Sequence, residues 1–205
     1  KTFFTLLIAL LMGSSALFAQ GFKAPSPGKA VVYFCRLTAY GGPVSFEYFH
    51  NDKYIGVFKG KNYMRYELDP GESLLWVSTE NKEFVTCDLK QGGSYIIIAD
   101  IIPGIMKARV GCTPITATDD RFEKAKAQIL SEPPVVTPQA KIDEMNKKLA
   151  KFIVENLDNY NNKWKNDKNF KHISPDKAIP ESAMHYPELN KKIPGKSPGI
   201  FYFIL

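Results

Sequence analysis

Short runs of apolar residues, several of them alternating with polar ones, fill the chain from Lys29 to Cys112, with turn residues between them. Runs that are rich in Val, Ile, Phe and Tyr and bounded by Gly, Pro, Asn or Asp predict β-strands. The predicted strands have the sequences KAVVYFCRL, VSFEYFH, YIGVFK, YMRYEL, SLLWVST, FVTCDL, SYIIIADI and IMKARVGC. Their connections are too short for crossover helices, so we expect neighbouring strands to pair antiparallel. Because about seven to eight strands tend to split into two packed sheets, the predicted fold is a mainly β, antiparallel β-sandwich.

The segment YELDPGESLLWVS, from Tyr66 to Ser78, contains a tight reversal between two of these strands. Pro70 fixes its φ angle, and Gly71 tolerates the backbone conformation that closes a turn. Asp69 is also common in turns, because its side chain bonds to nearby backbone groups. The corner therefore predicts a structural β-turn and not a catalytic loop.

After Cys112 the apolar residues recur every three or four positions, which predicts a C-terminal α-helical extension. The segment TDDRFEKAKAQILS predicts a first helix that ends before Pro133 and Pro134. Thr137 and Pro138 predict the start of a longer helix, with Thr137 as its N-cap. Its apolar stripe consists of Ile142, Met145, Leu149, Phe152, Ile153, Leu157, Tyr160 and Trp164. A stripe of this length must be covered, so we expect it to pack on one face of the sandwich or against a second chain.

From Asn166 onward Pro, Lys, Asn and Ser dominate, which predicts a mostly irregular tail. The tail ends in an apolar segment, Ile200 to Leu205, which predicts either a last strand or a docked plug. The sequence thus divides into a signal peptide over 1–19, a β-sandwich domain over 20–116, and a helical extension with an irregular tail over 117–205.

The N-terminal residues have the pattern of a secretory signal peptide. Lys1 precedes an apolar run from Phe3 to Met12, and small residues lead to the pair Ala19-Gln20. We expect cleavage after Ala19, with cleavage after Ala16 as the alternative. The first cysteine, Cys35, lies beyond this region, so no thiol is placed to carry an N-terminal lipid. The sequence predicts a periplasmic or secreted bacterial protein that is not lipid-anchored and has no transmembrane segment in its mature part.

Four local features of the region from Lys29 to Cys112 suggest a family. They are a Tyr-x-x-Arg strand end (Tyr33 to Arg36), the step Ile55-Gly56, the Pro-Gly corner and a Gly-x-x-Tyr entry at Gly92. With these features the region resembles a bacterial secreted-domain and lipoprotein family of unknown function, similar to PEGA-like and carboxypeptidase-regulatory-like β-sandwiches. The resemblance implies a sandwich fold and brings no activity, cofactor or catalytic residue.

Charge and cysteine content narrow the function classes. The net charge of +6 is spread over single lysines interrupted by acids, so nucleic acid is not an expected partner. The three cysteines, Cys35, Cys87 and Cys112, allow at most one internal disulfide, and the sequence leaves open whether one forms. Cys87 and Cys112 share strand faces with apolar residues, which predicts buried and unreactive thiols.

The residue patterns that mark common enzyme sites are mostly absent from the sequence. It contains no nucleophile elbow, no His-Glu-x-x-His motif and no phosphate-binding loop. The histidines, His50, His172 and His185, lie in separate segments, so we expect no metal site. We accordingly expect no catalytic residue and no cofactor.

Aromatic residues are the remaining candidates, because exposed rings can stack on sugars. Alternation along the strands places Tyr48 and Tyr66 with core residues, whereas Tyr63 falls beside polar neighbours. We therefore take Tyr63, Arg65 and Asp69 as the candidate binding surface.

The function that the sequence favours is a non-enzymatic one in the bacterial cell envelope, through contacts with an unidentified envelope protein or glycan. A carbohydrate-binding accessory module is the alternative, which an exposed coplanar pair of aromatic rings would support. A hydrolase with a site between sandwich and extension is a further alternative, which needs two close carboxylates, or a cysteine beside a histidine, in a concave pocket.

Overall fold

The computed structural model of the chain describes residues 21–40, 43–102, 109–167 and 169–185. The strands are β1 (Ala30–Arg36), β2 (Ser45–His50), β3 (Lys53–Lys59), β4 (Asn62–Leu68), β5 (Gly71–Ser78), β6 (Lys82–Leu89), β7 (Ser94–Ile102), β8 (Arg109–Ile115) and β9 (Lys171–Ile173). The helices are α1 (Phe122–Ser131), α2 (Gln139–Lys148), α3 (Ala150–Asn159), the π-helical η1 (Tyr160–Trp164), α4 (Lys165–Asp167), the 3₁₀ turn η2 (Pro175–Lys177) and α5 (Glu181–Met184). The predicted signal peptide over 1–19, its cleavage site and the segment from Ile200 to Leu205 lie outside the described residues.

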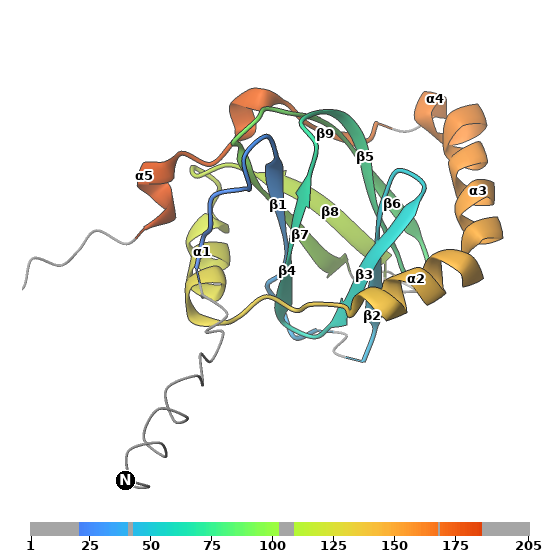
Figure 1. Ribbon diagram of the computed structural model, residues 1–205, viewed down its shortest axis with the longest axis horizontal. Coiled ribbons are helices and arrows are strands. Elements are labelled where there is room, and N and C mark those ends of the chain that lie inside the picture. The colour runs from blue at the N-terminus through green and yellow to red at the C-terminus, as the bar shows by residue number, and fades with distance from the viewer. Residues whose placement is uncertain (1–20, 41–42, 103–108, 168, 186–205) are drawn as a thin grey trace, which may run out of the picture.

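The strands form two sheets that pack face to face (Figure 1). Sheet A has the strand order β4-β1-β7-β8, and sheet B has the order β3-β2-β5-β6-β9. The predicted mainly β sandwich with C-terminal helices is confirmed. The expectation of antiparallel neighbours is wrong at two places, because β1 pairs parallel with β7 and β6 pairs parallel with β9. The chain between β1 and β7 passes through the other sheet, so short turns do not fix their relative direction.

The Asp-Pro-Gly corner carries the chain from one sheet to the other. β4 pairs with β1 in sheet A, whereas β5 pairs with β2 and β6 in sheet B. Gly71 has a φ of +100°, a conformation that residues with a Cβ atom rarely adopt. Beside it, Lys29 Nζ and Asp69 Oδ1 form an ion pair of 2.7 Å, in which the Asp69 side chain is 83% exposed. The geometry of Gly71, and not the charge of Asp69, is therefore what the corner needs.

Replacing Gly71 by Val should lower the free energy of unfolding by about 1 to 3 kcal/mol, because a β-branched residue is strained at positive φ. The control variant Asp69→Asn should change it by less than about 1 kcal/mol, because exposed ion pairs contribute little. Urea unfolding of both variants and the parent measures the two effects. Equal midpoints for Gly71→Val and the parent would contradict this account of the corner.

The central core lies between the two sheets and is rich in aromatic rings. Phe34 of sheet A contacts Tyr48 of sheet B with ring centroids 5.0 Å apart, and Tyr48 stacks on Phe58 at 4.8 Å. Tyr48 is fully buried, which confirms its predicted place in the core. Every residue of β1 is buried, because helix α1 covers the other face of sheet A. A strand buried on both faces explains why its sequence is a continuous apolar run.

Helices cover the outer faces of both sheets, which gives the molecule four layers (Figure 1). On sheet A, α1 places Phe122, Ala125 and Ile129 in a buried cluster with residues of β1 and β7. On sheet B, Met145 of α2 and Ile153 of α3 join an aromatic cluster. The aromatic residues of that cluster that are fully buried are Phe49, Tyr54, Trp76 and Phe84. The apolar stripe of the second predicted helix thus packs on the sandwich, as expected.

The long predicted helix differs from the observed one in two ways. It is interrupted at Leu149, which separates α2 from α3, and again by the π-helical turn η1. The prediction of Thr137 as N-cap is wrong, because its Oγ1 instead accepts a hydrogen bond of 3.1 Å from the backbone N–H of Val57. The side-chain amide of Asn146 pairs in the same way with both backbone groups of Tyr54. Both contacts supply hydrogen-bond partners to backbone groups at the outer edge of β3. An uncovered edge strand could instead pair with a strand of another chain.

The predicted irregular tail contains an additional strand. β9 pairs with β6, and its Ile173 is 1% exposed in the central core. Further along, the backbone N–H of Ile179 donates to the carbonyl of Ser94, which ties the tail to the start of β7. Among the described residues, no helix combines the length and the hydrophobicity needed to cross a bilayer.

Candidate functional site

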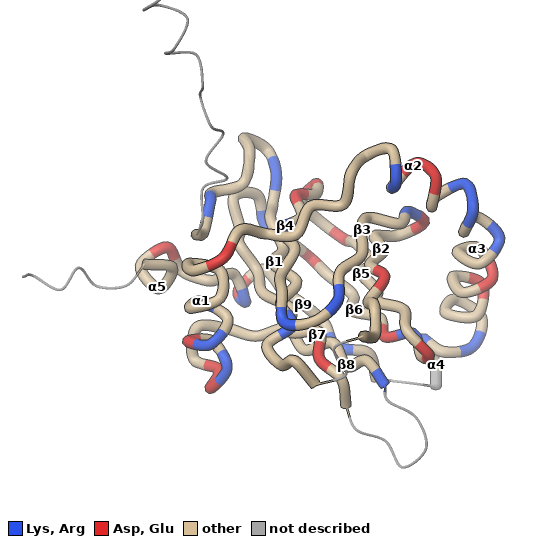
Figure 2. Tube along the Cα trace, turned by 90° about the horizontal axis from the view of Figure 1, so that it is seen from below, with Lys and Arg blue, Asp and Glu red and all other residues tan. Residues whose placement is uncertain are grey.

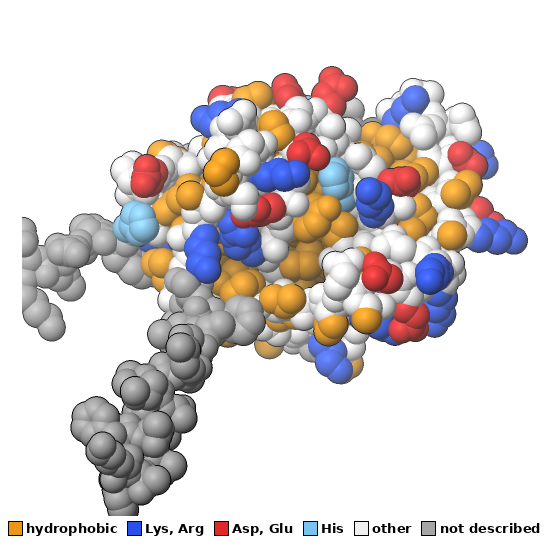
Figure 3. Space-filling model, viewed as in Figure 1, with side chains coloured by type: hydrophobic (Ala, Val, Ile, Leu, Met, Phe, Trp, Pro, Cys, Tyr) orange, Lys and Arg blue, Asp and Glu red, His pale blue; other side chains and the backbone are white. Residues whose placement is uncertain are grey.

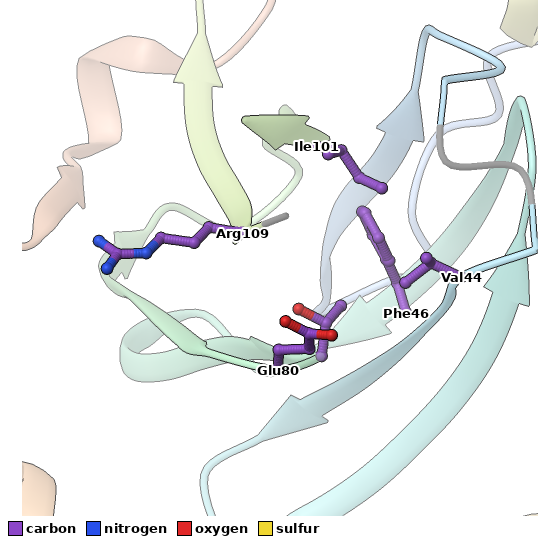
Figure 4. Close-up of a pocket in the computed structure, with 6 residues that line it drawn as sticks. Val44, Phe46, Glu80, Ile101 and Arg109 are labelled. Carbon is purple, nitrogen blue, oxygen red and sulfur yellow. The ribbon is translucent and has the colours of Figure 1, made fainter. Parts of the chain in front are cut away.

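A small cavity opens at one end of the sandwich, between the two sheets (Figure 4). The last residues of β1, β5 and β7 and the first residues of β2, β6 and β8 meet there, and we name it the cavity end. The cavity has a volume of about 30 Å³ and is lined by Val44, Phe46, Thr79, Glu80, Ile101 and Arg109. This volume suits one water molecule or a methyl group from a partner, whereas small-molecule pockets usually measure about 300 to 1,000 Å³.

Arg36 holds the loop that forms one wall of the cavity. Its side chain is fully buried, with Nη1 donating to the carbonyl of Val44 at 2.9 Å and Nη2 donating to that of Tyr40 at 2.7 Å. The guanidinium also lies over the Phe46 ring, 4.4 Å from its centroid. Burial lowers the pKa of Arg36, but a guanidinium stays charged in proteins. A buried cation therefore fixes the backbone on both sides of this loop.

Asp100 fixes the start of the same loop. Its Oδ1 accepts hydrogen bonds from the backbone N–H of Leu37 at 3.2 Å and of Thr38 at 3.3 Å. The loop then presents Tyr40, which is 61% exposed, and β7 ends nearby at Ile102, which is 54% exposed. Single exposed apolar residues are ordinary, but two large ones at the same end of a sandwich are typical of a contact surface.

Charged and polar groups surround these apolar side chains. In Figure 4 the Arg109 side chain extends away from the cavity, whereas Val44, Phe46 and Ile101 lie together on the other side. The Asn81 amide pairs with the backbone of Val110, with distances of 2.9 Å and 2.7 Å. This pairing joins the β5–β6 turn to the start of β8, so the rim of the cavity is held from both sheets.

The structure does not bring the predicted site residues together in one surface. Tyr63 is 1% exposed, and its hydroxyl donates to the carbonyl of Glu132 at 2.9 Å, so the expectation of an exposed ring is wrong. Helix α1 and the segment after it cover this face of β4, which alternation alone does not reveal. Arg65 is half-buried and forms a 2.6 Å ion pair with Glu67. Asp69 is exposed, but it lies at the end of β4 opposite to the cavity end.

A polar cluster around His50 joins three strands at that opposite end. His50 Nδ1 lies 3.0 Å from the Tyr66 hydroxyl, and Nε2 lies 3.3 Å from Ser73 Oγ. Burial, together with Lys53, lowers the pKa of His50, so the ring is neutral at pH 7. The ring lies within hydrogen-bond distance of these two hydroxyl groups, whereas the hydrolase alternative requires two close carboxylates, or a cysteine beside a histidine, in a concave pocket.

All three cysteines are free and buried. Burial raises the pKa of Cys87 to about 12 and also raises the pKa of Cys35 and Cys112 well above the usual range. The thiols are therefore uncharged near neutral pH, as predicted for Cys87 and Cys112. Within the described ranges, no three His, Cys, Asp or Glu side chains are grouped closely enough to hold a metal ion.

Sequence reasoning missed Arg36, Tyr40 and Ile102. Arg36 was noted only as the end of a strand motif, although a basic residue that closes a fully apolar strand indicates a buried charge with partners. Tyr40 lies in a Gly- and Pro-containing loop, where an aromatic residue has no strand face to fill. Ile102 ends a strand that is apolar from Tyr95 onward except for Asp100, so no change in pattern marks it as exposed.

No protein-family model and no curated protein sequence matches this chain. Membership in the PEGA-like secreted-domain family therefore stays a prediction, and the function is argued from the geometry of the cavity end.

Proposed function

We propose that this protein is exported to the periplasm or the exterior of a bacterium and acts there through contacts of its cavity end, without catalysing a reaction. The observation that carries the proposal is the exposure of Tyr40 and Ile102 on segments that Arg36 and Asp100 hold in place. A surface that is ordered before binding loses little conformational entropy when a partner docks. The signal-peptide pattern of residues 1–19 supports the exported location.

A carbohydrate of the envelope is the second candidate partner. The exposed ring of Tyr40 lies at the same end as Thr79 and Glu80, whose oxygens suit sugar hydroxyl groups. Tyr40 is the exposed aromatic residue within the described part of the chain, so stacking would involve a single ring there. A partner that offers both apolar and charged groups would explain the exposure of Ile102 as well as that of Tyr40. We therefore rank such a partner ahead of a carbohydrate.

Retention of the purified protein on the envelope fraction of its own cells tests the proposal. The double variant Tyr40→Ser, Ile102→Ser should lose most of the retention, because both large apolar contacts are removed. The control variant Val154→Ser removes an apolar residue that is 57% exposed on α3, and it should be retained like the parent.

Thermal unfolding of the variants verifies that all of them are folded. Equal retention of the double variant and of the Val154→Ser control would overturn the proposal. Loss of the parent's retention when soluble envelope polysaccharide is added would favour the carbohydrate candidate.

A further inference from the structure

The two ends of the sandwich differ in charge. Figure 2 views the molecule from below, toward the cavity end, and shows basic residues in the β3–β4 turn. The exposed charged side chains of the described strand ends and turns there are Lys59, Lys61, Arg109 and Glu80. Among these exposed side chains three cations thus stand against one acid, and the half-buried Lys82 and Asp100 at the same end offset each other in charge.

The opposite end has the reverse balance. Its exposed charged residues in the turns and first strand positions are Asp52, Lys53, Asp69, Glu72 and Lys90. The half-buried Lys29 there is already paired with Asp69. Over the face seen in Figure 3 basic and acidic side chains are intermingled, so the excess of exposed cations in the turns distinguishes the cavity end from the opposite end.

We propose that the cavity end binds the surface of a membrane that contains anionic headgroups. This inference deepens the proposed function and rests on it, because it names the partner of the same surface. Lysine and arginine near an anionic bilayer are attracted to its headgroups, and this attraction weakens with salt. A Tyr ring and an Ile side chain suit the boundary between headgroups and acyl chains, where amphipathic and apolar groups are both accommodated.

The arrangement of the strands places the cations around the apolar residues. Lys59 and Lys61 flank the turn between β3 and β4, at one edge of each sheet, and Arg109 begins β8, at the other edge of sheet A. The loop with Tyr40 joins β1 to β2, and Ile102 ends β7, so both lie between these edges. With strands about 4.8 Å apart and sheets about 10 Å apart, these residues lie within a patch that is a few strand spacings wide.

The long lysine side chains add reach to this surface. Lys59 and Lys61 can extend along the turn and place their ammonium groups at headgroups while the exposed Tyr40 meets the apolar boundary. The Ile102 side chain lies over Gly111 on the outer face of sheet A and adds an apolar contact at the margin of this surface. Glu80 opposes binding, and the remaining excess of charge is modest. The interaction should therefore be reversible and strongest at low ionic strength.

Co-sedimentation with vesicles tests the inference directly. The purified protein should bind vesicles of phosphatidylglycerol and phosphatidylcholine and should bind vesicles of phosphatidylcholine alone much more weakly. Lys59→Glu, Lys61→Glu should reduce binding to the anionic vesicles about tenfold or more, since each lysine near the surface contributes several-fold. The matched variant Lys53→Glu, Lys90→Glu changes net charge equally at the opposite end and should bind within about twofold of the parent.

Comparing the two lysine variants also cancels any contribution of an apolar N-terminal segment to vesicle binding, because the parent and both variants contain the same segment. Equal binding to both vesicle types, or an equal loss in both lysine variants, would overturn the inference. A second copy of the chain as the partner would appear as salt-sensitive self-association without vesicles, and this too would overturn it. If the parent is retained on envelopes through Tyr40 and Ile102 but ignores anionic vesicles, the lipid partner is wrong while the proposed contact function stands.

Discussion

Replacing Ile153 by Ala should lower the free energy of unfolding by about 2 to 5 kcal/mol. Ile153 is 2% exposed and lies in the cluster that joins α3 to the outer face of sheet B. In that cluster Phe49 stacks on Trp76 with ring centroids 3.8 Å apart, so the surface beneath the helix is rigid and aromatic. Removing three carbon atoms from a helix packed on such a surface leaves a cavity that the neighbours fill only in part.

The neighbouring residue supplies the control. Val154 is 57% exposed on the same helix, and Val154→Ala should change the stability by less than about 0.5 kcal/mol. Chemical unfolding followed by tryptophan fluorescence measures both variants, because Trp76 and Trp164 belong to this cluster. Similar midpoints for the two variants would show that α3 is not docked on the sheet.

Replacing Arg36 by Met should destabilise the protein by about 3 to 5 kcal/mol. The variant keeps an apolar stem in the buried site but leaves the carbonyls of Tyr40 and Val44 without their charged donor. It also removes the guanidinium from the face of Phe46. Because hydrogen bonds to charged groups are worth about 1.5 to 3 kcal/mol each, two of them account for most of the loss.

Arg109→Met is the matched control for the loss of a cation at the same end. Arg109 is exposed, so its replacement should change the free energy of unfolding by less than about 0.5 kcal/mol. Amide hydrogen exchange of the Arg36 variant should also show faster exchange around Tyr40. Unchanged stability in Arg36→Met would contradict the role given to this buried cation.

The strands and helices of this fold could be predicted from the sequence because their signals are local. Each strand from β1 to β7 coincides with a run of apolar residues between turn residues, and α1 has clear helical spacing. Which strands pair is not a local property. The parallel pairing of β1 with β7 depends on how two sheets pack, and the three-residue strand β9 is too short to show a period.

The candidate site was less predictable for the same reason. Tyr63 has polar neighbours on its strand face, but α1 covers that face, and alternation along a strand carries no information about a helix that packs on it. Tyr40 and Ile102 belong to one surface only because β1 and β7 are parallel and end together. Their spacing in the sequence therefore gave no sign that they act together.

The central claim is that the cavity end is the surface through which the protein makes contacts. Hydrogen–deuterium exchange of the purified protein, with and without the envelope fraction of its own cells, tests it most directly. We expect protection by the envelope fraction in the loop around Tyr40 and in the turns at Lys61 and Glu80. We expect no change at the Asp-Pro-Gly corner or at Gln91, which lies in the β6–β7 turn at the opposite end. Protection confined to the corner and Gln91, or spread equally over both ends, would contradict the account.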